Sequence, residues 1–461
     1  MKEKNWKEKI HAYALKNAIE HNGKAIEGAV ISSLFHEGLE KEEVKNIISE
    51  VKKIVFEVNS LSFQKQEEEF KKLEKDVSRR EIREGLPELP NVKGKVVLRI
   101  APYPSGALHI GNARTLILND EYAKKYKGKL LLVIDDTIGS EKKQIVPEAY
   151  KLIEEGVKLL SIKYSKLIRK SERLEIYYNY AKKLIEKEKA YVCSCSAETL
   201  RKNRSEGKEC SHRKQTAREN LELWKKMFDK SIREGQYILR IKTSMKDKNP
   251  AFRDRVLFRI CDREHPRVGR KYRIWPLLDF SWAIDDYLLG ITHIIRGKEL
   301  MIETEMEKYI FDIFGWKKPE FIHMGLLQFE GIKLSKSKGQ HEIKSKKYSG
   351  WDDPRTWSIQ SLVKRGIQLE VLRKFLIELG INQNEISAPI DVLYSENRKA
   401  LHELARQAKF KKGKGNIKVI MDDGKIIGGS SDIKPKKDEI IHFIGFGYAK
   451  FDGDKFYFAH K

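Results

Sequence analysis

Segments whose apolar residues recur every three or four positions alternate with short, continuously apolar runs in the middle of the chain. The continuous runs at residues 95–100 and 130–134 predict strands, the second of them buried on both faces. Helical periodicity follows each run, at residues 109–126 and 146–160. The order strand, helix, strand, helix is typical of an α/β protein with a doubly wound, Rossmann-type parallel sheet.

The same pattern returns later in the chain, with a predicted strand at 290–296 and a predicted helix at 300–314. The residues in between, from about 190 to 265, contain short predicted strands at 237–241 and 256–260. We therefore expect an insertion that splits the α/β sheet into two halves.

Both ends of the chain differ from this centre. The first 85 residues have helical spacing, residues 346–408 are mostly helical, and residues 409–418 form a basic, glycine-containing linker before strand-like alternation. Asp423-Gly424 and Asp452-Gly453 predict hairpin turns in this last part. We predict six domains: a helical module (1–85), the first half of the sheet (86–189), an inserted domain (190–270), the second half of the sheet (271–345), a helical domain (346–408) and a small β-barrel (409–461).

The charge of the chain suggests a polyanionic partner. Its 461 residues contain 92 Lys and Arg against 67 Asp and Glu, a net charge of +25. Nucleic acid is the first candidate partner, and a generally lysine-rich proteome is the alternative. We expect no transmembrane helix, because no run of about 18 apolar residues exists. The absence of a secretory signal pattern and the four cysteines, too few for a disulfide scaffold, predict a cytoplasmic protein.

The first candidate site is the segment RIAPYPSGALHIGN, from Arg99 to Asn112. A strand ends there, a proline-stiffened loop follows, and a helix begins at His109. Free N–H groups at a helix N-terminus attract phosphate, and Gly106 and Gly111 let the backbone approach a ligand closely. His109 can donate a hydrogen bond to a phosphate oxygen. By itself, such a loop is more often a plain connection.

The second candidate site is the segment IKLSKSKG at residues 332–339. Three lysines, Lys333, Lys336 and Lys338, alternate with two serines and predict a mobile, cationic loop. Such a loop suits a pyrophosphate leaving group, on which negative charge develops in the transition state. Taken alone, it is only a low-complexity basic loop.

Together the two segments resemble the HIGH and KMSKS motifs of class I aminoacyl-tRNA synthetases. Arg99, the Asp135-Asp136-Thr137 segment and the run from Asp285 to Arg296 resemble glutamyl-tRNA synthetases. The helical module and the segment Asp353-Pro-Arg-Thr-Trp-Ser358 resemble the archaeal-type branch of that family. The resemblance implies ATP-dependent ligation of L-glutamate to the 3′ end of tRNA-Glu through a glutamyl adenylate, with Mg²⁺.

The resemblance also assigns roles to individual residues. His109 and Lys336 would stabilise the phosphates, supported by Ser335 and Lys333. ATP would bind at Pro102, Gly106, His109, Gly111, Asn112 and Lys336. L-glutamate would bind at Arg99, Ala101, Ser105, Asp135, Leu278 and Arg296, with the arginines on its carboxylates and Asp135 on its ammonium group. The inserted domain would bind the tRNA acceptor end, the helical domain the tRNA stem and the C-terminal barrel the anticodon, in a monomer.

Three residues depart from the family pattern. Asn112 replaces the last histidine of the HIGH motif, Leu278 stands where many relatives carry a tyrosine, and Val133 stands where many carry an arginine. The C-terminal strands occupy so few residues that one small barrel is the upper limit. We therefore expect reduced or unusual reading of the anticodon.

A third candidate site is a cysteine cluster in the insertion. Cys193 and Cys195 are followed by Cys210 and His212, and three thiols with one imidazole fit a closed tetrahedral Zn²⁺ site. Reduced thiols in a small insertion are the alternative. Members of the resembled branch often carry a structural zinc here. Cys261 is expected to be an ordinary core residue.

Two other functions compete with glutamate ligation. A glutaminyl-tRNA synthetase would have the same fold, but Arg296 argues for an acidic substrate, since a buried guanidinium facing a neutral amide would be poorly compensated. A non-catalytic tRNA-binding relative is the other alternative, against which the intact His109, Ser335 and Lys336 argue. Whether tRNA-Gln is also charged with glutamate does not follow from the sequence.

Overall fold

The computed structural model describes residues 6–39, 43–77, 85–138, 144–332 and 334–461. These residues belong to two compact units, Met1–Glu84 and Gly85–Lys461. Each unit has its own hydrophobic core, so each is described separately. None of the helices in the described parts of the chain is long and apolar enough to cross a membrane.

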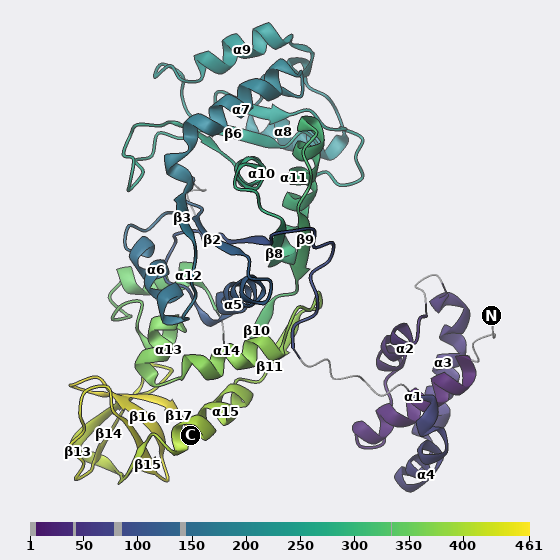
Figure 1. Ribbon diagram of the computed structural model, residues 1–461, viewed down its shortest axis with the longest axis vertical. Helices are drawn as coiled ribbons and strands as arrows, with labels where there is room; N and C mark the ends of the chain where they lie inside the picture. The colour runs from purple at the N-terminus through teal and green to yellow at the C-terminus, as the bar shows by residue number, and fades with distance from the viewer. Residues whose placement is uncertain (1–5, 40–42, 78–84, 139–143, 333) are drawn as a thin grey trace. The chain divides into compact units, whose positions relative to one another are not determined.

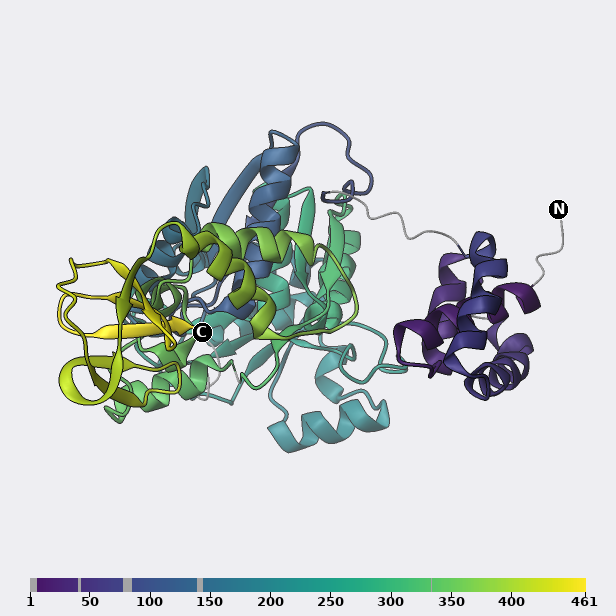
Figure 2. The ribbon, with the colours of Figure 1, turned by 90° about the horizontal axis from the view of Figure 1, so that it is seen from below.

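The first unit is helical, as predicted (Figure 2). It consists of α1 (Trp6–Glu20), α2 (Glu27–His36), α3 (Val44–Asn59), α4 (Phe63–Leu73) and the short 3-10 helix η1 (Glu74–Asp76). The apolar stripe of α3 packs Val51 and Val55 into the core. The buried Gln66 amide joins two elements, because its Nε2 donates to the carbonyl oxygens of Val58 and Gly23. The hydrophobic core and this amide contact hold the four helices together.

A parallel sheet forms the centre of the second unit (Figure 1). Strands β1 (Val97–Ile100), β2 (Lys129–Ile134) and β3 (Lys166–Arg169) pair in parallel, as do β8 (His293–Gly297) and β9 (Glu320–Met324). The backbone N–H of Thr292 donates to the carbonyl of Val97, which places β8 beside β1. The resulting order β3-β2-β1-β8-β9, with α5 (Ile110–Lys125) and α6 (Ala149–Leu159) as crossovers, confirms the doubly wound fold.

An antiparallel sheet and several helices lie between the two halves of the parallel sheet. The sheet has the order β4-β5-β6-β7, from β4 (Ala190–Cys193), β5 (Ile238–Ile241), β6 (Val256–Ile260) and β7 (Ile274–Pro276). The helices are α7 (Leu174–Glu186), α8 (Ala197–Glu206), α9 (Ala217–Lys226) and α10 (Leu278–Leu288), whereas α11 (Met301–Phe314) connects β8 to β9. Helices α8 and α9 were not predicted, because their sequences are mostly polar; hydroxyl caps from Ser196 and Thr216 begin them. Cys261 is buried in the core of this region, as expected.

Helices lead from the parallel sheet to the C-terminal strands. They are α12 (Lys336–Lys344), α13 (Ile359–Arg365), α14 (Leu369–Glu378) and α15 (Ile390–His402), with β10 (Leu327–Phe329) and β11 (Ile386–Ala388) paired in parallel. Short 3-10 helices occur at η2 (Lys170–Glu172), η3 (Ser211–Lys214), η4 (Lys298–Leu300) and η5 (Pro354–Thr356). The buried Arg365 ties α13 to the last strand, since it donates to the carbonyls of Phe458 and Ala459.

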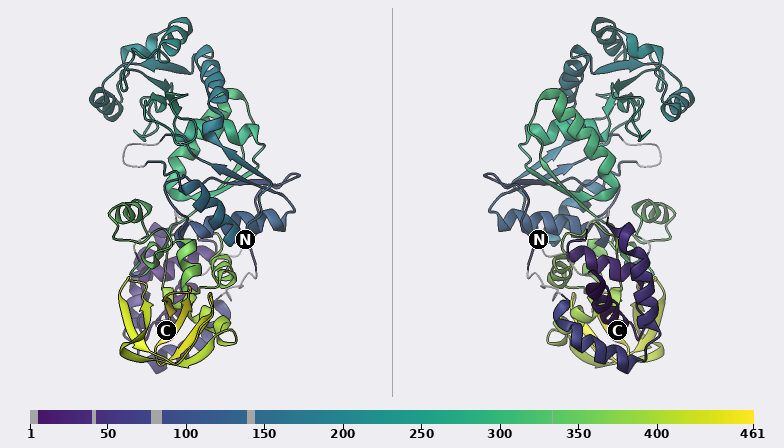
Figure 3. Two further views of the ribbon diagram at one scale, coloured as in Figure 1. Left: turned by 90° about the vertical axis from the view of Figure 1, so that its left-hand side faces the viewer. Right: turned by 90° about the vertical axis from the view of Figure 1, so that its right-hand side faces the viewer.

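The C-terminal part is a six-stranded sheet, drawn in yellow in Figure 3. Its order is β12-β15-β16-β17-β13-β14, from β12 (Arg406–Lys409), β13 (Lys411–Ile420), β14 (Ile426–Ser430), β15 (Ile440–Ile444), β16 (Gly447–Phe451) and β17 (Phe456–His460). The predicted linker at 409–418 is wrong, because these residues lie in β12 and β13. Their basic side chains are exposed while their backbone pairs with β14, and backbone pairing needs no apolar side chain.

Candidate active site

A cavity of about 490 Å³ opens where the carboxyl ends of β1, β2 and β8 meet. This edge is where ligands bind in open α/β sheets. The cavity brings together ten of the predicted residues: Arg99, Ala101, Pro102, Ser105, His109, Asn112, Asp135, Leu278, Arg296 and Lys336. A second cavity of about 520 Å³ is also lined by His109 and Asn112, and by Gly111. The two cavities therefore adjoin at the start of α5. Lys333 lies outside the described residues.

The loop before α5 is fixed at both ends. His109 is the N-cap of α5, and the Asn112 side-chain oxygen accepts from the His109 backbone N–H at 3.3 Å. The backbone N–H of Ile110 donates to Trp357 O, and that of Ile359 donates to Leu108 O. Asn112 thus has a structural role in closing the first turn, and residues 357–359 form a short ladder with the loop.

Gly106 allows a tryptophan ring to pack on this loop. Its φ of +148° lies in the region that favours glycine, and a Cβ atom there would lie 2.2 Å from the ring of Trp351. Trp351 is held by its carbonyl, which accepts from the Ser358 hydroxyl at 2.6 Å. A Cβ on Gly111 would lie 2.9 Å from the Leu334 side chain. Both motif glycines therefore permit close packing around the loop.

His109 is an uncharged donor at neutral pH. Burial, together with the nearby Lys336, lowers the pKa of His109 to about 3. Its Nδ1 is buried without a hydrogen-bond partner among the residues the structure describes. A neutral imidazole can donate one hydrogen bond to a phosphate oxygen but adds no positive charge.

The cationic segment is more ordered than a mobile loop. Ser335 is the N-cap of α12, and its hydroxyl accepts from the Lys338 backbone N–H at 3.2 Å. Lys336 is the first residue of the helix and lines the cavity together with Ser337. The expectation of a loop was wrong from residue 335 onward, because the serine satisfies a free N–H group and so begins a helix.

Ion pairs hold the buried cationic side chains in and next to the cavity wall. Arg99 donates through Nε and Nη2 to both carboxylate oxygens of Asp286, at 2.6 and 2.8 Å. The fully buried Lys170 lies 3.5 Å from Asp135 and donates to the Ser281 hydroxyl at 3.0 Å. Burial lowers the pKa of Lys170, and Asp135 opposes that effect.

Arg296 also has an acidic partner. Its Nη1 donates to Glu307 at 2.8 Å and its Nη2 donates to the Thr304 hydroxyl at 2.6 Å. The sequence argument that Arg296 would lack compensation beside a neutral substrate is therefore wrong. The guanidinium of Arg296 is balanced within the protein by a glutamate from α11.

The indole ring of Trp282 is the common neighbour of the cationic groups. It lines the cavity, and the charged ends of three side chains lie 4.7, 5.0 and 4.9 Å from its ring centre: those of Arg99, Lys170 and Arg296. Cation–π contacts of this kind stabilise charges that have lost water. Trp282 therefore acts as a spacer between the two arginines.

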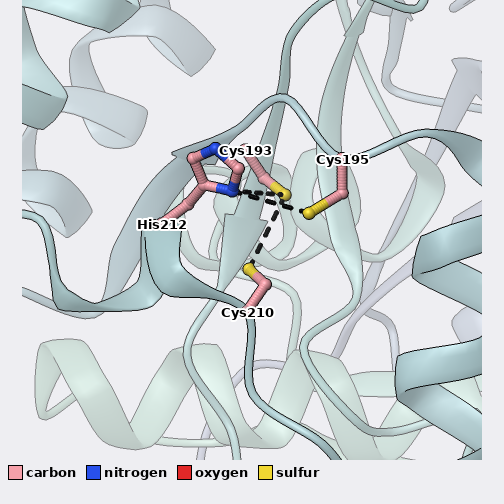
Figure 4. A group of neighbouring side chains, drawn as sticks. All are labelled: Cys193, Cys195, Cys210 and His212. Atoms are coloured by element: carbon pink, nitrogen blue, oxygen red, sulfur yellow. Dashed lines mark hydrogen bonds between the residues drawn. The ribbon is translucent and has the colours of Figure 1, made fainter.

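The cysteine cluster gathers Cys193 from the end of β4, Cys195 just after it, Cys210 just before η3 and His212 from η3 (Figure 4). The ligand atoms of Cys193, Cys195, Cys210 and His212 all lie within 4.8 Å of one another. Cys193 Sγ is 3.8 Å from Cys210 Sγ, and His212 Nδ1 is 3.5 Å from Cys195 Sγ. The other ring nitrogen, Nε2, lies 2.8 Å from the Ser194 hydroxyl, which leaves Nδ1 directed at the sulfurs.

Comparison with known proteins identifies the family of the chain. Residues 95–403 match the model of the catalytic domain of class I tRNA synthetases (E and Q). The chain belongs to this family.

Two archaeal relatives are named glutamate--tRNA ligase. The protein of Methanothermobacter marburgensis is 42% identical over 405 residues, which span 87% of this chain and 72% of that protein. The protein of Methanocaldococcus jannaschii is 43% identical over 404 residues, with the same coverage. Among solved structures, a glutamate tRNA ligase from Elizabethkingia meningosepticum in complex with its amino acid has a TM-score of 0.47 and 20% identity, covering 68% of this chain and 70% of that one.

Several residues of this synthetase site were not found from the sequence. Lys170, Trp282 and Glu307 sit on elements whose apolar periodicity gives no hint of a cavity, and they are far apart in the sequence, so only the folded chain makes them neighbours of the cavity residues. The segment that ends at Ser358 was noted only for its resemblance to the archaeal-type branch, and its support of the motif loop through Trp351 was not predicted.

Proposed function

We propose that the protein is a glutamate--tRNA ligase that joins L-glutamate to the 3′ end of tRNA-Glu at the expense of ATP. The observation that carries this proposal is the pair of adjoining cavities that meet at His109 and Asn112. The cavity with Arg99, Asp135 and Arg296 suits an amino acid with two carboxylates, and the second suits the adenosine of ATP. The membership of the chain in the synthetase family supports it.

The first step is the attack of a glutamate carboxylate oxygen on the α-phosphorus of ATP. This forms glutamyl adenylate and releases pyrophosphate. Asp135 binds the ammonium group, and the guanidinium groups of Arg99 and Arg296 bind the carboxylates. His109 donates a hydrogen bond to a phosphate oxygen as a neutral imidazole, and the Lys336 ammonium offsets the charge that develops on the leaving pyrophosphate. Mg²⁺, carried in with ATP, neutralises its phosphates.

In the second step, a hydroxyl of the terminal ribose of the tRNA attacks the glutamyl carbonyl. The ester forms, and AMP leaves with the electron pair of the broken acyl–phosphate bond. The net charge of +25 favours binding of the tRNA backbone. We assign the acceptor end to the insertion, the stem to the helices after β10 and the anticodon to the C-terminal sheet, in a cytoplasmic monomer.

The cysteine cluster fits a structural Zn²⁺. A tetrahedral zinc with sulfur at about 2.3 Å and nitrogen at about 2.05 Å requires S···S distances of about 3.8 Å and S···N distances of about 3.6 Å. The corresponding distances are 3.8 Å for Cys193 to Cys210 and 3.5 Å for Cys195 to His212. The hydrogen bond of His212 to Ser194 is the kind of outer contact that orients a metal-ligating imidazole.

Charging of tRNA with labelled amino acids tests the proposal. Purified protein with ATP and a mixture of tRNA-Glu and tRNA-Gln should form labelled glutamyl-tRNA from glutamate and no product from glutamine. Formation of glutaminyl-tRNA instead would support the alternative substrate, and no product with either amino acid would support a non-catalytic tRNA-binding protein.

A further inference from the structure

The buried Glu307 changes what Arg296 can do for a substrate. The exposed fraction of the side chain is 4% for Arg296 and 0% for Glu307, and their contact is 2.8 Å long. Glu307 comes from α11, behind the cavity wall, and does not line the cavity itself. The positive charge of Arg296 is therefore already neutralised by Glu307 before a ligand binds.

The other buried cations near this cavity are balanced in the same way. The three cations around Trp282 each have one acidic partner: Arg99 with Asp286, Lys170 with Asp135, and Arg296 with Glu307. Two further charged residues line the cavity: Lys336, whose charge serves the phosphates of ATP, and Glu299, which also lines the second cavity. Free L-glutamate carries one net negative charge, whereas L-glutamine carries none. A buried, uncompensated charge is costly, so this arrangement by itself does not favour glutamate.

Protonation of Glu307 would make the site prefer L-glutamate to L-glutamine. One carboxylate oxygen of Glu307, Oε1, accepts from Arg296, while Oε2 is buried without a partner among the described residues. A proton on Oε2 leaves the contact through Oε1 in place and gives the pair a net positive charge. The negative charge of the glutamate side-chain carboxylate then neutralises this net positive charge.

The groups that face Glu307 favour an easily protonated carboxyl. Burial raises the pKa of Glu307 to about 7, a direction that Asp286 on α10 reinforces and that Arg296 on β8 and Arg99 on β1 oppose. From β9, His323 lies 2.8 Å from the Thr304 hydroxyl that also binds Arg296, and burial lowers the pKa of this histidine. A proton taken up next to Arg296 therefore binds to Glu307 rather than to His323.

We propose that Glu307 is a specificity-determining positioning residue, which takes up one proton from solvent when the side-chain carboxylate of glutamate binds to Arg296. The inference rests on the proposed function. Binding of glutamate is then coupled to protonation and weakens as the pH rises, whereas a neutral amide gains nothing from the proton. The pocket selects for glutamate through the charge state of a residue that the substrate does not touch.

The pH dependence of the KM for glutamate tests this coupling. In ATP–pyrophosphate exchange with tRNA-Glu present, raising the pH from 7.0 to 8.5 should raise the wild-type KM more than about tenfold, because each pH unit above the pKa costs about a factor of ten. Glu307→Gln cannot titrate and should keep a nearly constant KM. Glu305→Gln, an exposed change on the same helix, is the matched control and should follow the wild type.

Calorimetry gives a second readout that does not depend on the variant folding. Titration of L-glutamate into the wild-type protein with tRNA-Glu at pH 8.0, in two buffers of different ionisation enthalpy, should show uptake of close to one proton. Uptake near zero, or the same KM profile in Glu307→Gln and wild type, would overturn the inference. A wild-type protein without glutamate-dependent exchange at any pH would instead refute the proposed function.

Discussion

The neutral state of His109 makes the folded protein sensitive to acid through one identifiable side chain. Burial and Lys336 lower the pKa of His109 from 6.5 to about 3. Between these two pKa values the unfolded chain binds a proton at His109 that the folded protein does not bind. The folded state is therefore not penalised above about pH 6.5, and it loses stability relative to the unfolded chain as the pH falls toward 3. Each pH unit in the window is worth about 1.4 kcal/mol. Lowering the pH from 7.5 to 5.0 should cost the folded state about 2 kcal/mol through His109.

The substitution His109→Gln removes the titrating group and should remove this loss. Urea denaturation of wild type and variant at pH 7.5 and 5.0 measures it. The difference in unfolding free energy between the two proteins should move by about 2 kcal/mol in favour of the variant at pH 5.0. His402→Gln, which changes an exposed imidazole on α15, should produce no such movement. A movement of less than about 0.5 kcal/mol would refute the assignment of His109 as a neutral donor.

Four further outcomes follow from the site and the fold. Lys336→Ala should slow ATP–pyrophosphate exchange by roughly 100- to 1000-fold while tRNA affinity stays near normal, and a near-normal rate would exclude its role at the phosphates. The double variant Cys193→Ser/Cys195→Ser should lose the single equivalent of zinc that elemental analysis should find in wild type, whereas metal-free wild type with normal charging would leave only reduced thiols. Gly106→Ala should lower the unfolding free energy by about 1–3 kcal/mol more than Gly413→Ala, because the two glycines have similar φ values of +148° and +140° but only the first meets a tryptophan ring; equal losses would argue against that contact. Single substitutions of the anticodon bases of tRNA-Glu should lower kcat/KM by less than about a thousandfold, and losses equal to those of a full-length relative would show normal anticodon reading.

Much of the central fold was predictable because the sheet is buried on both faces. Strands such as Leu130–Ile134 are then continuously apolar, and a continuous run next to helical periodicity has few other interpretations. The predicted linker from Lys409 to Lys418 gave the opposite result. Its exposed lysines and glycines read as a linker, yet the backbone pairs with β14, and backbone hydrogen bonds leave no trace in side-chain composition.

The candidate site was predictable where its residues belong to a contiguous motif. Arg99, His109 and Lys336 could be recognised in this way, and the structure places all three on one cavity. Glu307 could not be recognised, because it is one acidic residue on a helix with a solvated face, and its importance depends on a contact with Arg296 eleven residues earlier in the chain. Side-chain partners of this kind depend on the packing of α11 against the sheet, and local periodicity does not reveal them.

ATP–pyrophosphate exchange with each amino acid in turn, with and without tRNA-Glu, is the most direct test of glutamate activation at this site. The account predicts exchange with L-glutamate alone among the amino acids, strongly increased by tRNA-Glu, and roughly 100- to 1000-fold slower in Lys336→Ala. Exchange driven by L-glutamine, or no exchange with any amino acid in the presence of tRNA, would contradict it.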